Sequence, residues 1–162
     1  MEIDYVQLLS RWLHITAAVA AGGGAIFMKF ALHPATETLP GDTRAELREA
    51  VRSRWAKVVH TAIAVLLLTG LFNFMLIVKR YDVPKGYHAV FGVKFLLAMA
   101  IFFFGSVLVG RGELAKKLRA AAGKWLTVLV VLLLGLLLAS STLKIMPRTE
   151  KVPPPAAQAG AG

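Results

Sequence analysis

The sequence contains no cysteine and few charged residues, and both shortages narrow what the protein can be. With no cysteine among the 162 residues, the chain has no disulfide, thiolate metal site, iron–sulfur cluster or covalent c-type haem attachment. Charged residues make up 17% of the chain and apolar residues 57%, whereas soluble globular proteins have about 25% and about 45–50%. The apolar residues fall into long blocks, so the composition predicts an integral membrane protein.

Four apolar blocks are each long enough to cross a bilayer as a helix, which takes about 20 residues. The predicted spans are 12–32, 58–78, 89–109 and 125–146. We therefore expect an all-α, integral membrane, four-helix up-down bundle that forms one domain over 1–146. Glu2 and Asp4 precede the first block, which is the wrong charge for a signal peptide, so this block is expected to be retained. The Pro/Ala/Gly-rich tail, 147–162, is expected to be disordered.

Lys and Arg outnumber Asp and Glu by 19 to 9, and most of these charges lie between the apolar blocks. We expect them to contact lipid phosphates and to set the topology rather than to bind nucleic acid. Eleven Lys and Arg flank the first and third connections, against seven on the opposite side. This bias predicts that both connections are cytoplasmic, that both termini lie outside the cytoplasm, and that the chain is in the inner (plasma) membrane.

Between the first two spans the sequence predicts a short amphipathic helix. Thr43 and Glu46 have the spacing of a capping box, and Leu47, Val51 and Trp55 then recur every four residues. We expect this helix to lie on the inner membrane surface and to run into the second span. A solvated connecting helix is the other interpretation, and it predicts much the same shape.

Four histidines lie near the ends of the predicted spans. His14 and His88 share the outer level, while His33 and His60 share the inner level. His14 and His33 are about 28 Å apart along a helix, so they cannot serve one metal. His33 precedes Pro34, which disfavours a helical conformation, so we expect His33 in a loop or at the interface.

Very small side chains follow His14 on the same helical face. They are Ala17, Ala18, Ala21, Gly24 and Ala25, with Gly22 and Gly23 alongside. A flat macrocycle held by His14 would need such a groove, because a porphyrin edge does not fit against Leu or Phe. Close packing of two helices without a cofactor is the commoner use of small residues in membranes, and both interpretations stay open.

Lys94 is the most costly residue in the predicted spans. An ammonium in the membrane costs on the order of 2.5–3.5 kcal/mol on insertion scales, and no Asp or Glu lies within any span to neutralise it. Snorkelling to the outer boundary, about 9 Å away, is one explanation. The other is a bound partner, such as a porphyrin propionate or a quinone oxygen.

The order of these motifs resembles that of the HemJ and CopD families of membrane proteins. The run Arg11-Trp12-Leu13-His14, followed by the Gly-rich stretch, resembles the opening helix of both families. The run 27–33 (FMKFALH) is similar to the close of that helix in HemJ-like proteins, and the run 92–97 (GVKFLL) resembles a Val-Lys-Leu-Leu step in their third helix. The resemblance covers roughly the first 110 residues in order and spacing.

The resemblance implies a four-helix bundle that holds b-type haem or acts on a porphyrin. By position, His14 would be an axial ligand, and Lys94 would stabilise haem propionates or a reacting tetrapyrrole as the catalytic residue. HemJ-like proteins oxidise protoporphyrinogen, whereas CopD-like domains are associated with copper uptake. His88 lies six residues before Lys94 rather than two, and the fourth span lacks an acidic residue near its start. These departures favour a general haem-binding redox role over protoporphyrinogen oxidation.

The leading hypothesis is therefore a membrane oxidoreductase or electron-transfer protein that binds haem b. His14, paired with His88 or His60, would hold the iron, and a quinone or porphyrin would be the substrate. His14 and His88 are the better pair, because they differ in depth by about 4.5 Å. The remaining residues predicted to contact the cofactor are Ala18, Ala21 and Gly22.

Two other functions compete with haem binding. In copper transport, the four histidines would combine with Met28, Met75 and Met99, since thioether and imidazole groups suit copper. In a non-catalytic membrane subunit, the histidines would be interfacial and the small residues would be helix contacts. Such a subunit would belong to a homo-oligomer or a larger membrane complex.

Overall fold

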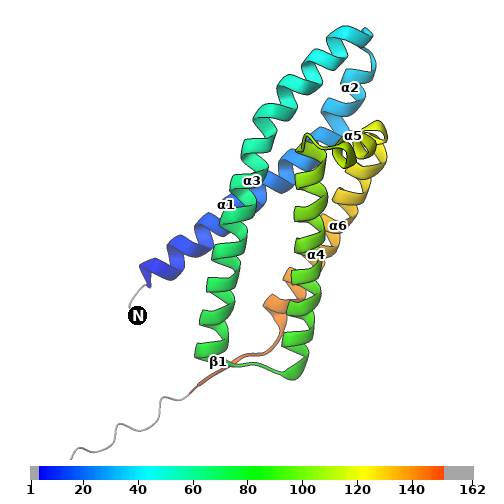
Figure 1. Cartoon of the computed structure of the whole chain (residues 1–162). Coiled ribbons are helices and arrows are strands. Elements are labelled where there is room, and N and C mark those ends of the chain that lie inside the picture. The colour runs from blue at the N-terminus through cyan, green and yellow to red at the C-terminus, as the bar shows by residue number, and fades with distance from the viewer. Residues whose placement is uncertain (1–3, 152–162) are drawn as a thin grey trace, which may run out of the picture.

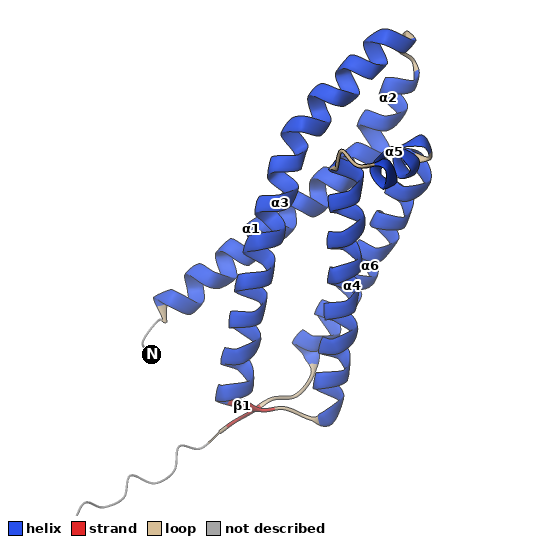
Figure 2. Ribbon diagram, in the orientation of Figure 1, coloured by secondary structure: helices blue, strands red, loops and turns tan. Residues whose placement is uncertain are grey.

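The computed structural model of the chain describes residues 4–151, and it is almost entirely helical (Figures 1 and 2). The first helix, α1 (Tyr5–Phe27), continues through a π-helix, η1 (Met28–Leu32), into α2 (His33–Glu37). The later helices are α3 (Gly41–Arg80), α4 (Lys85–Val109), α5 (Glu113–Ala120) and α6 (Ala122–Ile145). Two short strands, β1 (Tyr81–Asp82) and β2 (Thr149–Glu150), complete the described fold.

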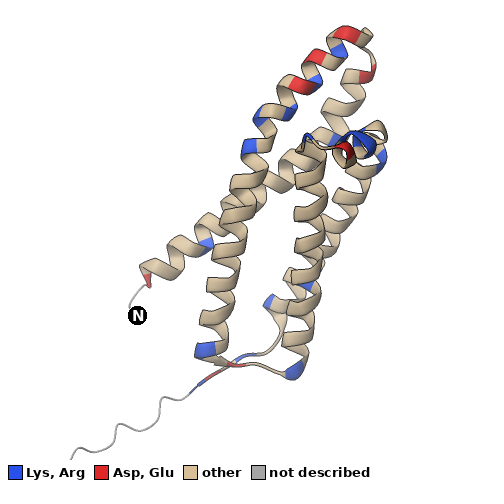
Figure 3. Cartoon of the chain, viewed as in Figure 1, with Lys and Arg blue, Asp and Glu red and all other residues tan. Residues whose placement is uncertain are grey.

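Four helical segments are long and apolar enough to cross a membrane: Tyr5–Glu37, Gly41–Arg80, Lys85–Val109 and Ala122–Ile145. Each covers one predicted span to within a residue, so the all-α, multi-pass membrane bundle is confirmed. Charged residues gather toward the two ends of the bundle (Figure 3). We call these the α5 end, where α5 lies, and the β1 end, where β1 lies. Large apolar side chains such as Leu68 and Leu96 are exposed on the outer faces, where lipid chains would solvate them.

α3 is about twice as long as a bilayer crossing requires. Its 40 residues rise about 60 Å, while the hydrocarbon core is about 30 Å thick. Its first part and α2 form a hairpin that projects beyond α5 (Figure 1). The segment predicted to be an amphipathic helix is helical, but it continues the axis of the second span instead of lying flat. α3 begins at Gly41 with Pro40 at its N-cap, so Thr43 does not form the predicted capping box.

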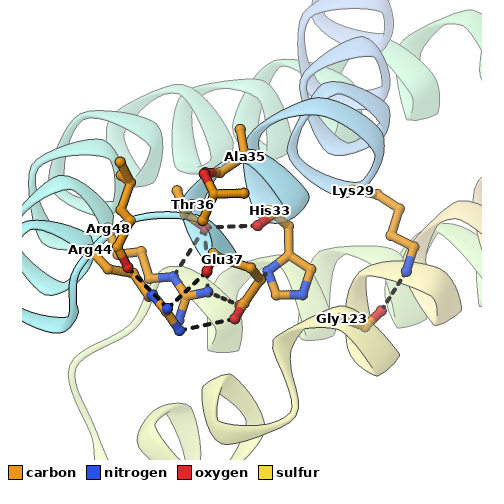
Figure 4. A network of polar contacts seen from close by, with 10 residues as sticks. Lys29, His33, Ala35, Thr36, Glu37, Arg44, Arg48 and Gly123 are labelled. Carbon is orange, nitrogen blue, oxygen red and sulfur yellow. Dashed lines mark hydrogen bonds and ion pairs between the residues drawn. The ribbon is translucent and has the colours of Figure 1, made fainter.

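Polar side chains attach α2 to α3 within the hairpin (Figure 4). Glu37 accepts hydrogen bonds from Arg44, with Nη1 to Oε2 at 2.9 Å, and from Arg48. The buried Thr36 hydroxyl donates to the His33 carbonyl at 2.8 Å. Several charge-assisted bonds therefore converge on one carboxylate, and they hold the hairpin together outside the membrane.

The π-helix η1 keeps His33 helical despite the proline that follows. Pro34 has no N–H, so the normal i→i−4 bond at that position is lost. The hydrogen-bond ladder shifts to the wider π spacing, and the His33 N–H bonds to the Met28 carbonyl. The expectation that His33 leaves the helix is therefore wrong. Lys29 Nζ donates to the Gly123 carbonyl at 3.1 Å and so attaches η1 to the start of α6 (Figure 4).

Two arginines satisfy the carbonyls at the end of α4. Arg52 of α3 donates to the Val109 carbonyl at 2.7 Å, and Arg119 of α5 donates to the Gly110 carbonyl at 2.5 Å. Carbonyls at a helix C-terminus have no partner in their own helix, so these bonds fix α3 and the unpredicted α5 to this end. Arg52 also donates to Glu49 at 2.7 Å, and this hydrogen bond lowers the pKa of the Glu49 carboxyl.

A two-residue antiparallel ribbon closes the β1 end. β1 pairs with β2, and Arg80 Nε donates to Glu150 Oε1 at 2.9 Å. The ribbon includes part of the tail that we expected to be disordered, since 147–151 are described and residues 149–150 form β2. The rest of that tail, 152–162, lies outside the described residues.

α1 packs closely on its neighbours where it carries glycine. A Cβ on Gly24 would lie 1.9 Å from Trp55 Cη2, so the indole from α3 fills the space that this glycine leaves. A Cβ on Gly22 would lie 3.2 Å from a Leu133 methyl of α6. Part of the small-residue face is therefore used for helix contacts, which was one of the two interpretations.

We expect Gly24→Ala to destabilise the protein, because its methyl group would overlap the Trp55 ring and force it to move. Overpacking of this kind costs about 1–3 kcal/mol, so the midpoint of thermal unfolding in detergent should fall. Gly23→Ala is the matched control, since nothing lies within 4 Å of a Cβ at that position. Its midpoint should stay the same or rise slightly, and equal midpoints for the two variants would contradict this packing.

Candidate functional site

A cavity of about 190 Å³ lies inside the bundle, lined by residues of α1, α3, α4 and α6. Leu71 lines it toward the β1 end and Trp55 toward the α5 end. These residues are about 24 Å apart along α3, so the cavity is elongated. Its walls are apolar except for His14 and Lys94, which are its only ionisable lining residues in the described chain.

His14 is held by a hydrogen bond between α1 and α3. Its Nδ1 lies 2.8 Å from Thr69 Oγ1, and this hydroxyl donates to the Val65 carbonyl at 2.6 Å. A hydroxyl has a single proton to donate, and with that proton directed at the Val65 carbonyl we assign the Thr69 oxygen as the acceptor from His14. The neutral imidazole therefore carries its proton on Nδ1 and a lone pair on Nε2. Histidines that bind metals are usually oriented in this way, by a partner on the other ring nitrogen.

The close approach of α1 and α3 makes the His14–Thr69 bond possible. The His14 ring lies against Gly70, where a Cβ would be 3.2 Å from Cε1. A larger residue at Gly70 would push the imidazole away from α3. The position of His14 therefore depends on a glycine of the neighbouring helix as well as on the small residues that follow it on α1.

Lys94 lines the same cavity from α4. Within residues 4–151, every acidic partner of an ion pair lies outside the apolar stretches, and none pairs with Lys94. The cavity lining also contains no carboxylate. Lys94 is half-buried, and a cation removed from water without a counter-charge is costly, so the ammonium suits a ligand that carries an anionic or strongly polar oxygen.

Four of the six residues predicted to contact a cofactor line this one cavity. They are His14, Ala18, Ala21 and Gly22. Gly22 also contacts α6 at Leu133, so it serves both the cavity wall and helix packing. The small-residue face thus makes close helix contacts at Gly22 and Gly24 and lines the cavity at Ala18 and Ala21.

The structure does not bring His60 or His88 to His14. Both are exposed and neither lines the cavity. His60 Nδ1 is 2.7 Å from the Ala56 carbonyl of its own helix, and the His88 ring packs edge-on against Phe74 with centroids 6.2 Å apart. In this structure His14 is the only histidine of the described chain that lines the cavity, so neither predicted pair shares it.

The residues suggested for copper are dispersed. No group of three or more His, Cys, Asp or Glu that could hold a metal occurs within residues 4–151. His33 lies at the α5 end, with Nδ1 3.8 Å from Glu37 Oε1. Met28, Met75 and Met99 do not line the cavity.

Sequence analysis missed Thr69, which orients His14. A threonine in an apolar helix usually bonds to its own backbone, as Thr69 does with Val65, so the sequence carries no separate signal. Its role depends on which residue of α1 lies opposite.

One turn nearer the β1 end, the same helical faces carry Ser10 and Asn73, and Ser10 Oγ and Asn73 Oδ1 are buried without a hydrogen bond in the described chain. The polar strip between α1 and α3 therefore extends beyond His14.

Comparison of the chain with protein-family models, curated proteins and solved structures finds no match.

We predict that Thr69→Val changes the protonation pattern of the His14 ring. Without the hydroxyl, the Nδ1–H has no acceptor, and the Nε2–H tautomer should gain population. Nitrogen NMR of the ¹⁵N-histidine-labelled protein would report this change. Thr61→Val, at an exposed position of the same helix, should leave the His14 signals unchanged. A His14 ring that is already protonated on Nε2 in the unmodified protein would contradict the hydrogen-bond assignment.

Proposed function

We propose that this chain is a membrane redox protein that binds b-type haem in the cavity, with His14 as its single histidine ligand. One observation carries the proposal. A single cavity brings together an imidazole with a free Nε2, an ammonium without an acidic partner, and a wall of very small side chains. These are the groups that an axial ligand, a propionate and a ring edge would require.

His14 and Lys94 have the chemistry that haem requires, but the enclosed volume is small for haem. His14 fits an axial ligand because Thr69 holds Nδ1–H and leaves Nε2 available. Lys94 fits a propionate by charge. The volume of about 190 Å³ is smaller than the about 300–1,000 Å³ of pockets that enclose drug-sized ligands. The enclosed volume would therefore hold only part of a macrocycle.

A bound haem would supply one-electron redox chemistry. If haem is bound, His14 would supply the lone pair that holds it, Thr69 would keep the imidazole in its orientation, and Lys94 would stabilise negative charge on the group. The apolar walls exclude water, so these electrostatic interactions are stronger than they would be in solution. We propose a lipid-soluble quinone or a porphyrin as the reaction partner, with oxidation of a porphyrin-type substrate included as in HemJ-like proteins.

Of the competing functions, a purely structural subunit has one observation in its favour. The contacts of Gly24 with Trp55 and of Gly22 with Leu133 explain part of the small-residue face without a cofactor. They do not explain an unpaired ammonium in an apolar cavity. Copper transport has less support, because the residues it would use are dispersed.

We further propose that the α5 end faces the cytoplasm of a cell whose inner, or plasma, membrane contains the bundle. The Lys- and Arg-rich first and third connections both lie at this end (Figure 3), and such loops are retained on the cytoplasmic side. The N-terminus and β2 would then lie outside the cytoplasm.

The protein, purified from cells supplied with excess haem, should show a Soret band and one broad visible band in its reduced-minus-oxidised spectrum, as a haem with a single histidine ligand does. His14→Ala should abolish these bands, whereas His60→Ala and His88→Ala should retain them because neither side chain lines the cavity. Metal analysis of the same samples gives the second readout. Stoichiometric copper without haem, or a colourless, metal-free protein, would overturn the proposal. Equal loss of haem in His14→Ala and His88→Ala would overturn the assignment of a single histidine ligand.

Lys94→Met should lower the midpoint potential of the bound haem, because a nearby cation stabilises the more electron-rich reduced state. The expected decrease is on the order of tens of millivolts for a charge in a medium of intermediate dielectric. Redox titration followed by absorbance would measure it. Lys144→Met, at an exposed position outside the cavity, is the matched control and should leave the potential unchanged. Equal potentials in the unmodified protein and Lys94→Met would contradict the role of Lys94.

A further inference from the structure

The cavity that contains His14 and Lys94 is not fully enclosed. Leu71 of α3 and Phe95 of α4 both line it, yet their exposed fractions are 45% and 39%. Both residues lie well within helices that are long and apolar enough to cross the membrane. What these side chains face is therefore the hydrocarbon region of the bilayer rather than water.

The neighbouring contacts between α3 and α4 show where this opening lies. Toward the β1 end, Phe74 stacks on Phe91 with ring centroids 3.7 Å apart. Toward the α5 end, Val59 packs against Gly105, where a Cβ would be 3.7 Å from Val59 Cγ1. About 22 Å of α3 separates Val59 from Phe74, and Leu71 lies within this stretch. The two helices thus touch at both ends of a long seam, and the exposed lining residues of these two helices, Leu71 and Phe95, lie between the contacts.

The α5 end of the cavity is closed by protein. Trp55 lines the cavity there and fills the space beside Gly24. Close by, Arg52 on the same helix bonds to the last residue of α4, Val109. A ligand that arrived from this end would have to displace an indole and break a charge-assisted hydrogen bond, whereas the seam between α3 and α4 has only apolar side chains at its rim.

We propose that the ligand enters the cavity from within the bilayer, through a lateral window between α3 and α4 whose rim is formed by Leu71 and Phe95. The inference rests on the proposed function, because it takes the His14–Lys94 cavity, which haem would fill in the loaded protein, as the place where the ligand stops in the haem-free protein. The ligand class is an apolar molecule with an anionic or carbonyl oxygen, which is the chemistry that porphyrins and quinones share. Such a molecule dissolves in the hydrocarbon, so its apolar surface stays out of water along this path. Its oxygen finds a cationic partner at Lys94.

The absence of cysteine makes this window testable by thiol chemistry. In the cysteine-free protein, Leu71→Cys introduces a single thiol at the rim, and a benzyl methanethiosulfonate reagent would attach a bulky apolar group through a disulfide that a reductant removes. Leu68→Cys is the matched control. It lies one turn away on the same helix and is 72% exposed, but it does not line the cavity.

Ligand entry would be followed through Trp55, which lines the cavity. Trp12→Phe and Trp125→Phe leave Trp55 as the single tryptophan. Liposomes that contain the haem-free protein would be mixed with liposomes that contain either protoporphyrin IX or decylubiquinone. Quenching of Trp55 fluorescence would give the rate and the extent of binding. The probe that quenches would show whether the site accepts a porphyrin carboxylate or a quinone carbonyl.

The modified Leu71→Cys protein should bind at least tenfold more slowly than the same protein after reduction. The modified Leu68→Cys protein should bind at the unmodified rate. Equal rates for the two modified proteins, with quenching of normal extent, would overturn the window and leave the His14–Lys94 site standing. If neither ligand quenches Trp55 in any variant, both the window and the proposed site are wrong. Recovery of the rate on reduction distinguishes a blocked window from a misfolded variant.

Discussion

Polar groups in hydrocarbon must find partners inside the protein, and the rest of this structure depends on that constraint. The backbone meets it by forming helices, whose N–H and C=O groups bond within the segment. Few side chains form such hydrogen bonds, because the apolar stretches contain few polar residues. His14 bonds to Thr69 across two helices, and Thr69 bonds to its own backbone. Lys94 is the exception, because it has no acidic partner in the described chain.

The close approach of α1 to α3 connects helix packing with the site. Gly24 admits the Trp55 indole, and Gly70 admits the His14 ring. Each helix therefore offers a glycine to a large side chain of the other. The same contacts that hold the two helices together also place His14 at the cavity. The small residues of this protein therefore allow close helix packing and line part of the cavity at the same time.

Outside the hydrocarbon, the arginines act as structural connectors. Arg44 and Arg48 converge on Glu37, while Arg52 and Arg119 satisfy the carbonyls at the end of α4. Some of the excess positive charge at the α5 end therefore lies on guanidinium groups whose hydrogen bonds join helices. This explains how a chain with 19 basic and 9 acidic residues tolerates its imbalance. Guanidinium groups can bond to carbonyls as well as to carboxylates, so they need no equal number of acids.

The sequence by itself determined the four spans, the single bundle and the small-residue face of α1, because hydrophobic length and side-chain size are local properties. It also singled out His14 and Lys94, since an imidazole above a glycine-rich face and a lysine in an apolar helix stand out in any arrangement. Only the tertiary structure decided which polar groups meet. Thr69 could be matched to His14 only once α1 and α3 were packed antiparallel in one register, and His88 has the right depth but does not line the cavity. The depth of a residue in the membrane follows from its position along its helix. The direction in which its side chain points depends instead on how that helix is rotated against its neighbours. Contacts between residues far apart in the chain set this rotation.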